Sequence, residues 1–294
     1  MAEFTVSGLS LGQAHTTATR LLRQAKNETP ELDARLLLCH AAGLSHEAFV
    51  AGLNDTLPVD AGARFSALFE RRLAGEPVSR IMGVRQFYGR SFRIDGSTLD
   101  PRPDTETLIE AALTLVDRWA PLRLLDLGTG SGCILITLLA ELRKATGVGV
   151  DLSLPALECA LANAKTLGIA ERADFLASDW LEAVSGTFDL VVANPPYLSQ
   201  ADMAGLAREV RDHDPIGALD GGPDGLSAYR RIAPKLRKVL RPGGIALFEI
   251  GPSQADAVST LLAWEDLAVD SGQWRDLVGR PRVVGVRAKS LTSC

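Results

Sequence analysis

A glycine-rich turn, DLGTGSG at residues 126–132, directly follows an apolar run that begins at residue 122. Its three glycines, Gly128, Gly130 and Gly132, allow a sharp backbone turn and a close approach of the chain to a ligand. A helix is expected to begin directly after the turn. Strand, glycine turn and helix in this order are typical of a ligand-binding turn at the carboxyl edge of a parallel sheet, which constrains the fold strongly.

Short apolar runs alternate with helical stretches from about residue 104 onward. The expected strands are 122–128, 147–153, 173–179, 188–196 and 244–251, and the expected helices are 133–144, 153–167 and 180–184. Near-continuous apolar strands between helices indicate an α/β fold whose mostly parallel sheet is covered on both faces. Segments 267–274 and 281–288 are expected to pair as a final antiparallel hairpin.

The first 80 residues have an entirely helical pattern. Apolar residues from Leu11 to Ala25 recur at the three-to-four spacing of an amphipathic helix. Thr29-Pro30-Glu31 predicts a second helix that is capped by the threonine hydroxyl. Ser45 is expected to cap a third helix, and Pro58 is expected to open a fourth. A small helical bundle and a docking domain for a partner explain this segment equally well.

A β-hairpin is predicted between the two patterns, because apolar residues alternate on either side of Tyr88-Gly89. We therefore expect a helical domain at 1–80, a hairpin linker at 81–100 and an α/β domain at 101–294.

Acidic residues lie at the ends of three successive predicted strands. Asp126 opens the glycine-rich turn, Asp151 ends the second strand, and Asp179 ends the third, where Trp180 follows it. Asp151 can accept hydrogen bonds from both hydroxyls of a ribose. Asp179 can accept from an adenine amine, and the Trp180 indole can lie against the purine. Because parallel strands end at one edge of the sheet, these residues predict a shared pocket.

Two classes of cofactor fit this pocket. Dinucleotide enzymes favour GxGxxG, whereas the glycines here fall as GxGxG and Cys133 stands at the sixth position. That spacing, preceded by Asp126, is commoner for S-adenosylmethionine, which has no phosphate to be held. The ribose acid does not separate the two classes, because both cofactors carry a ribose.

The fourth strand ends in NPPY, residues 194–197, at the same edge of the sheet. This sequence suits methylation of a planar nitrogen, an amide or an aromatic amine, whose two N–H groups need acceptors when they are buried. The Asn194 side-chain oxygen and the Pro195 carbonyl can each accept one hydrogen bond, and Tyr197 can stack on the flat group. Pro195 and Pro196 stiffen the loop, so that the acceptors are held in place beforehand.

Composition argues against several other classes of protein. The 294 residues include 31 basic and 36 acidic side chains, and the net charge of −5 disfavours a broad nucleic-acid-binding face. No apolar stretch approaches the roughly 20 residues of a membrane helix, and the N-terminus lacks the pattern of a signal peptide. The cysteines form no CxxC pair and indicate reduced thiols in a cytoplasmic protein. Cys39, His40 and His46 lie in an apolar helical stretch, which favours packing over metal binding.

Several motifs together resemble the class I S-adenosylmethionine-dependent methyltransferases that modify amide or amino nitrogens: LDLGTGSG, VGVDLS, SDW and VVANPPY. The resemblance narrows to the HemK/PrmC family through GVRQFYGRSF at 83–92, PRPDTETLIE at 101–110, the segment 209–230 and LFEIG at 247–251. It covers nearly the whole chain. One departure is Asp100, where family members commonly carry an apolar residue.

The resemblance implies a Rossmann-like, mostly parallel seven-stranded sheet with an N-terminal helical bundle. It also implies a peptide-chain-release-factor glutamine N5-methyltransferase that modifies the GGQ tripeptide. The cofactor would be S-adenosylmethionine, with S-adenosylhomocysteine as product, and the partner would be a class 1 release factor, contacted by the helical domain. We expect a monomer that binds neither nucleic acid nor membrane directly.

The same resemblance, together with the pocket argument, assigns the site residues. The expected cofactor-binding residues are Asp126, Gly128, Thr129, Gly130, Ser131, Gly132, Asp151, Asp179, Trp180 and Asn194. The expected substrate-binding residues are Phe87, Asn194, Pro195, Pro196 and Tyr197, and among them Asn194, Pro195 and Tyr197 are the catalytic ones. No metal is expected.

Three other functions remain open from the sequence. An adenine or cytosine amino-methyltransferase of nucleic acid shares NPPY, but it would be expected to have a basic face or a target-recognition domain. A glutamine methyltransferase of a ribosomal protein is similar, although the intact RPDTE segment favours release factors. A non-catalytic binding module on the same scaffold is disfavoured by the intact glycine turn, ribose acid and NPPY.

Overall fold

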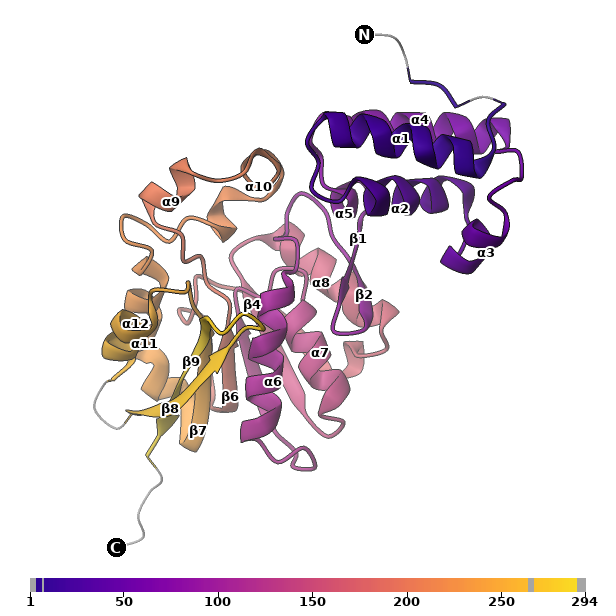
Figure 1. Ribbon diagram of the computed structural model, residues 1–294. Helices are drawn as coiled ribbons and strands as arrows, with labels where there is room; N and C mark the ends of the chain where they lie inside the picture. Colours follow the sequence, from indigo (N-terminus) through magenta and orange to yellow (C-terminus); the bar gives the residue numbers. More distant parts are fainter. Residues whose placement is uncertain (1–3, 7, 264–266, 290–294) are drawn as a thin grey trace, which may run out of the picture. The chain divides into compact units, whose positions relative to one another are not determined.

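The structure is a computed structural model that describes residues 4–6, 8–263 and 267–289. The chain divides into two compact units, Met1–Gly83 and Val84–Cys294 (Figure 1). Each unit has hydrophobic clusters of its own: one in the first unit and two in the second.

The first unit is helical, as expected. Its helices are α1 (Leu11–Gln24), α2 (Pro30–Ala42), α3 (His46–Ala51), α4 (Val59–Leu73) and α5 (Val78–Met82) (Figure 1). Leu37, Phe65 and Phe69 are fully buried in its core, since the apolar residues of α2 and α4 recur on one face of each helix. The Ser45 hydroxyl caps α3 by accepting from the Ala48 amide, as predicted.

The predicted hydroxyl cap of α2 is wrong. The Thr29 hydroxyl instead donates to Asp33 Oδ1 at 2.8 Å, and Asp33 Oδ2 accepts from Arg72 Nε at 2.7 Å. Asp33 and Arg72 are both buried, so the carboxylate needs several donors and competes with the helix end for the threonine hydroxyl. The short helix α5 was not predicted.

The second unit opens with the expected hairpin, formed by β1 (Val84–Phe87) and β2 (Arg90–Arg93). Its main sheet contains β3 (Arg123–Leu127), β4 (Thr146–Asp151), β5 (Ala173–Ala177), β6 (Phe188–Ala193), β7 (Leu240–Glu249), β8 (Leu267–Arg275) and β9 (Pro281–Ala288). The strand order is β5-β4-β3-β6-β7-β9-β8; the first five strands are parallel, and β9 and β8 are antiparallel to their neighbours. The expected seven-stranded, mostly parallel sheet and the final hairpin are confirmed.

Helices cover both faces of this sheet (Figure 1). One face packs on α6 (Glu106–Leu115), α7 (Cys133–Glu141) and α8 (Leu154–Thr166), and the other on α11 (Ser227–Val239) and α12 (Ala255–Leu262). Consecutive residues of β3 and β6 point to opposite faces: Leu124 and Val192 join one cluster, whereas Leu125 and Val191 join the other. This period of two explains the continuous apolar runs of the sequence.

Some connections differ from expectation. Residues 180–184 form a turn and not a helix, and α9 (Gln200–Ala204), α10 (Arg208–His213), α11 and α12 were not predicted. The Ser178 hydroxyl accepts from the Ala183 amide and holds the 180–184 turn. Among the described residues, no helix combines the length and apolar character that crossing a bilayer requires.

Candidate active site

A cavity of about 640 Å³ lies at the carboxyl edge of the sheet, where β3, β4, β5 and β6 end. Its walls come from the glycine-rich turn after β3, from the residues that follow β4, β5 and β6, and from two segments, 97–105 and 215–231. All lining residues belong to the second unit. The volume is within the range of small-molecule sites, and the position is the usual one for ligands in open α/β sheets.

The glycine-rich turn is left-handed at Gly128, Gly130 and Gly132, whose φ angles are 74°, 55° and 78°. The amides of Gly128 and Thr129 donate to the Val150 carbonyl, which ties the turn to β4. A Cβ at Gly132 would approach Ile136 Cδ1 to 2.8 Å and Ala160 Cβ to 3.1 Å, so a side chain there would require these neighbours to shift. A Cβ at Gly130 would meet nothing within 4 Å, which leaves its backbone open to a ligand.

Asp151 lies opposite this turn at the end of β4. Its Oδ2 accepts from the Gly130 amide at 2.9 Å, and its Oδ1 accepts from the Ser153 amide at 2.9 Å. The two amides hold the carboxylate in one orientation at the wall of the cavity. Its remaining lone pairs can accept further donors, which is the requirement for a pair of ribose hydroxyls.

Asp126 lies behind the turn, fully buried. Its Oδ2 accepts from the Thr129 hydroxyl at 2.7 Å. Burial raises the pKa of Asp126 to about 7, and the Thr129 hydroxyl counteracts part of this effect. Asp126 therefore supports Thr129, which does line the cavity.

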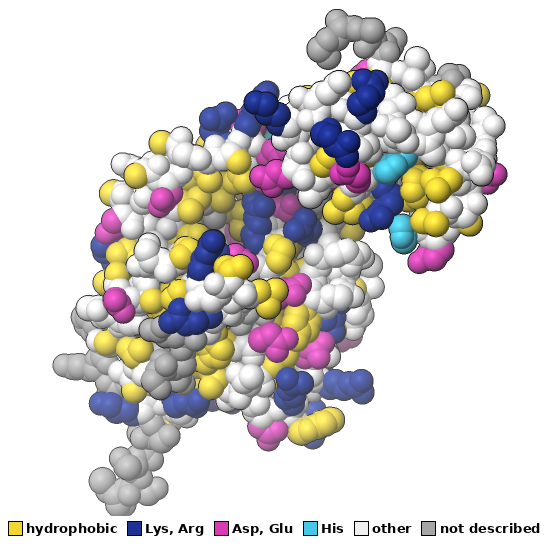
Figure 2. Space-filling model, in the orientation of Figure 1, with side chains coloured by type: hydrophobic (Ala, Val, Ile, Leu, Met, Phe, Trp, Pro, Cys, Tyr) yellow, Lys and Arg dark blue, Asp and Glu magenta, His cyan; other side chains and the backbone are white. Residues whose placement is uncertain are grey.

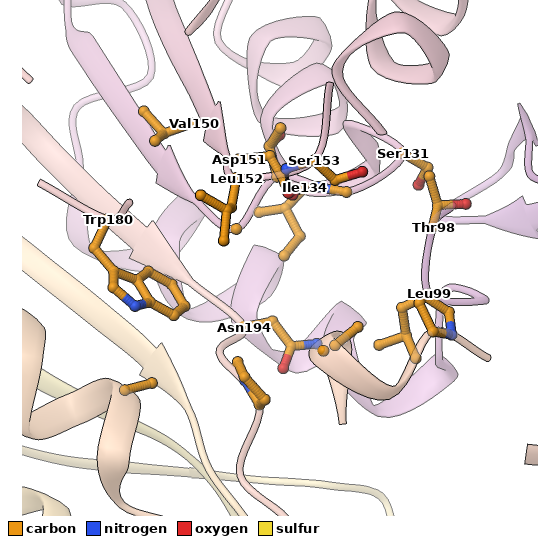
Figure 3. A pocket seen from close by; sticks show the side chains of 18 of the residues that line it. Thr98, Leu99, Ser131, Ile134, Val150, Asp151, Leu152, Ser153, Trp180 and Asn194 are labelled. Carbon is orange, nitrogen blue, oxygen red and sulfur yellow. Dashed lines mark hydrogen bonds between the residues drawn. The ribbon is translucent and has the colours of Figure 1, made fainter. Parts of the chain in front are cut away.

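Trp180 and Asp179 line the cavity after β5. Trp180 has a φ of 52°, which is uncommon for a large side chain, and its ring packs 3.5 Å from the position of a Cβ at Gly128. Asp179 also forms an exposed ion pair with Arg231 of α11. Figure 3 shows Trp180 and Leu152 on the same side of the cavity, where they offer apolar surface to a flat ring.

Asn194 follows β6, and its amide extends into the cavity (Figure 3). Its Nδ2 donates to Thr105 Oγ1 at 3.2 Å, which links it to the 3₁₀ helix η1 (Pro103–Thr105). Pro196 also lines the cavity. Tyr197 is half-buried, and burial raises its pKa to about 12, so its hydroxyl remains protonated at neutral pH.

The NPPY loop is fixed by a second loop, residues 219–225. Leu198 donates to the Leu219 carbonyl at 3.1 Å, and Gly221 donates back to the Leu198 carbonyl at 2.8 Å. Gln254 joins both loops, because its Nε2 donates to the Tyr197 carbonyl at 2.9 Å and to the Gly225 carbonyl at 3.2 Å. A Cβ at Gly225 would approach the Tyr197 carbonyl oxygen to 2.3 Å, so the close contact requires glycine.

The structure brings most of the predicted site residues to one cavity. Those that line it are Gly128, Thr129, Gly130, Ser131, Asp151, Asp179, Trp180, Asn194 and Pro196. Not among the described lining residues are Phe87, Asp126, Gly132, Pro195 and Tyr197. Phe87 is buried in the core, edge to face with Phe92 at 6.2 Å.

Other lining residues were not predicted individually. Leu152 is 74% exposed, next to the ribose acid, and Ile134 borders the cavity near it (Figure 3). Arg102 and Thr105 of the RPDTE segment line it, as does Pro101 just before that segment. Segment 97–99 carries no motif signal, and segment 215–220 lies within the family motif at 209–230 but was not assigned to the pocket. The tertiary fold brings both segments to the sheet edge.

Two family models match the chain. The PrmC N-terminal domain matches residues 13–83, and the Methyltransferase small domain matches residues 105–210. The release factor glutamine methyltransferase of Bradyrhizobium diazoefficiens is 46% identical over 284 residues, which is 96% of each chain. That of Cereibacter sphaeroides is 49% identical over 255 residues, or 87% of this chain and 90% of the relative.

The chain belongs to the family of release factor glutamine methyltransferases. The HemK/PrmC resemblance is thereby confirmed, and so is its methyltransferase fold. Among solved structures, a methyltransferase from Pyrococcus furiosus is similar with a TM-score of 0.51 and 14% identity, over 77% of this chain and 100% of that one. This likeness concerns the fold alone.

Proposed function

We propose that the protein transfers a methyl group from S-adenosylmethionine to the side-chain amide nitrogen, N5, of the glutamine in the GGQ tripeptide of class 1 release factors. The observation that carries this proposal is 46% identity over 96% of the chain to a release factor glutamine methyltransferase. NPPY beside a nucleotide-sized cavity supports it.

The cavity fits S-adenosylmethionine. Asp151 offers a carboxylate that two backbone amides already orient, which suits a ribose diol. Leu152 and Trp180 offer apolar surface on the same side, which suits an adenine ring (Figure 3). The open space above Gly130 lets the ligand approach the backbone.

When bound, the cofactor supplies an electrophilic methyl group. The protein's own task is to place a poor nucleophile, since the lone pair of an amide nitrogen is delocalised into the carbonyl. In the proposed mechanism, Asn194 Oδ1 and the Pro195 carbonyl oxygen each accept one N–H of the glutamine amide. These two acceptors orient the nitrogen and stabilise the positive charge that develops on it.

No strong base is required in this mechanism. The proton on nitrogen becomes acidic once the new bond to carbon has formed, and it can leave to water. Burial raises the pKa of Tyr197 to about 12, so its hydroxyl is protonated at neutral pH and is not available as a base.

A protein substrate agrees with the charge of the chain better than a nucleic acid does. The net charge is −5, and on the visible face acidic and basic side chains of the described residues are interspersed (Figure 2). A protein that binds the phosphate backbone of a nucleic acid would be expected to present a continuous basic surface. No specific observation favours the nucleic-acid reaction.

A methylation assay tests the proposal. Purified protein is expected to transfer a labelled methyl group to a recombinant release factor, and replacing the glutamine of its GGQ tripeptide by alanine should abolish the labelling. Ribosomal proteins and RNA from the same organism serve as competing substrates. Labelling of either one, with an unlabelled release factor, would overturn the assignment.

A further inference from the structure

The direction in which the Asn194 amide points is decisive for the proposed mechanism. An amide presents an oxygen on one side and an NH₂ group of similar size on the other. Only the orientation with Oδ1 toward the substrate accepts an N–H of the glutamine amide. The flipped orientation would place the NH₂ group of Asn194 against the NH₂ group of the glutamine, so that donors would face donors. Some feature of the protein must therefore select the orientation.

Thr105 is the direct partner of this amide. Asn194 Nδ2 donates to Thr105 Oγ1 at 3.2 Å, and Thr105 is only 2% exposed. A hydroxyl can nevertheless accept or donate. Thr105 alone would tolerate either orientation of the amide, because its O–H could rotate and donate to Asn194 Oδ1 instead.

Glu249 is a second buried residue near this amide. It ends β7, and the pairing of Ala193 with Phe248 in adjacent parallel strands puts Asn194 and Glu249 at neighbouring strand ends. Glu249 is 1% exposed, and neither of its carboxyl oxygens has a well-formed hydrogen bond with the described residues. The Thr105 hydroxyl is close enough to lower the pKa of this carboxyl.

Charged and titratable groups surround Glu249 on several elements. They are Arg102 just before η1, Asp104 in η1, Cys133 on α7, Tyr197 after β6, Tyr229 on α11 and Arg282 on β9. Burial raises the pKa of Glu249 to about 7, while Thr105, Arg282 and Arg102 lower it. The orientation argument concerns the carboxylate form of Glu249, because a carboxylate can only accept hydrogen bonds.

We propose that Glu249 and Thr105 are positioning residues that hold the Asn194 amide with its oxygen toward the substrate. Glu249 takes the hydrogen of the Thr105 hydroxyl. Only lone pairs of Thr105 then face Asn194, so the amide must turn Nδ2 to Thr105 and Oδ1 to the cavity. This inference rests on the proposed role of Asn194 as an acceptor.

The first test replaces the threonine. Thr105→Val keeps the shape of the side chain and removes the hydroxyl, and Thr105→Ser keeps the hydroxyl. At pH 8 with saturating substrates, kcat for release factor methylation should fall about 10- to 100-fold in Thr105→Val, the usual scale for losing the partner of a functional side chain. Thr105→Ser should recover most of the loss.

A matched control is Thr137→Val. Thr137 is fully buried in α7, its hydroxyl has no hydrogen-bond partner among the described residues, and it does not line the cavity. Its kcat should equal that of the wild type. The Kd for S-adenosylmethionine and the KM for the release factor should change less than about threefold in Thr105→Val, which separates positioning from loss of a cavity wall.

The second test addresses Glu249. In Glu249→Gln the new amide can donate to Thr105, which frees the hydroxyl hydrogen to reach Asn194 Oδ1 and permits the flipped amide. The kcat of this variant should fall on the scale of Thr105→Val. Because both residues act through one amide, the double variant should fall no further than the stronger single variant.

Two outcomes would overturn the inference. One is a Thr105→Val enzyme with unchanged kcat, or with a loss confined to the Kd for S-adenosylmethionine. The other is full additivity of the two substitutions, which would indicate independent structural effects. If instead the wild-type protein does not label a release factor in the same assay, the proposed function itself fails.

Discussion

Asp126 is a carboxyl group without solvent exposure, directly behind the glycine-rich turn. A charge in that place is costly, and burial raises its pKa from 3.8 to about 7. In the unfolded chain the same group ionises from about pH 4. The contribution of Asp126 to stability is therefore present below about pH 4 and is lost as the pH rises toward 7.

This leads to a prediction for Asp126→Asn, whose side chain stays neutral. Burying the new NH₂ group lowers the free energy of unfolding of the variant by an amount that does not depend on pH. The variant does not pay the pH-dependent cost of ionising a buried carboxyl group. Its stability relative to the wild type should rise between pH 4 and pH 8, by at most on the order of 4 kcal/mol at 1.36 kcal/mol per pKa unit.

Urea denaturation of both proteins at several pH values measures this difference. Asp174→Asn on β5 is the control, because Asp174 is exposed. A difference between Asp126→Asn and the wild type that stays constant with pH would mean that Asp126 ionises normally in the folded protein.

At the scale of elements, the NPPY loop has little regular structure of its own and depends on its neighbours. Gln254, just before α12, donates to carbonyls of the NPPY loop and of the 219–225 loop and accepts from the Gly251 amide at 2.9 Å. The stiffness expected from Pro195 and Pro196 is thus supplemented by a side chain 57 residues away from Tyr197.

Replacing Gln254 by glutamate should loosen this loop. The substitution keeps the size of the side chain but turns the donor that faces two carbonyls into an acceptor. Losing two partly buried hydrogen bonds costs roughly 1–3 kcal/mol, so kcat/KM should fall about 5- to 150-fold. Gln200→Glu, at an exposed position on α9, is the control. Equal activity of the two variants would contradict a role for Gln254 in holding the loop.

At the scale of the whole molecule, the boundary between the compact units at Gly83 coincides with the end of the match to the PrmC N-terminal domain, residues 13–83. The cavity lies wholly in the second unit, which has its own clusters on both faces of the sheet. Truncation can therefore test cofactor binding by the second unit separately from the expected docking of the release factor on the helical unit.

A fragment of residues 84–294 should fold and bind S-adenosylmethionine within about threefold of the full chain. Its KM for a release factor should rise at least tenfold if the helical unit contributes docking surface. Calorimetry measures the first quantity, and steady-state methylation measures the second. A fragment with full activity on release factors would contradict the docking role of the helical unit. Circular dichroism is the control that a fragment with low activity is folded.

The sequence by itself determined the α/β class, the five parallel strands and the final hairpin. It did so because strands buried on both faces must be apolar throughout, and because glycine is required where φ is positive at Gly128 and Gly130. It also singled out Asp151, Trp180 and Asn194, because polar or aromatic residues stand out at the ends of apolar strands.

Only the tertiary structure decided which groups support them. Thr105 meets Asn194 across 89 positions of sequence, and the end of β7 brings Glu249 near Asn194 because β6 and β7 are adjacent in the sheet. The burial of Asp126 and Phe87 away from the cavity, and the replacement of the predicted helix at 180–184 by a turn, were decided in the same way. Local pattern reports which face of a strand is buried, but the partner of a buried polar group depends on strand order, which no local pattern contains.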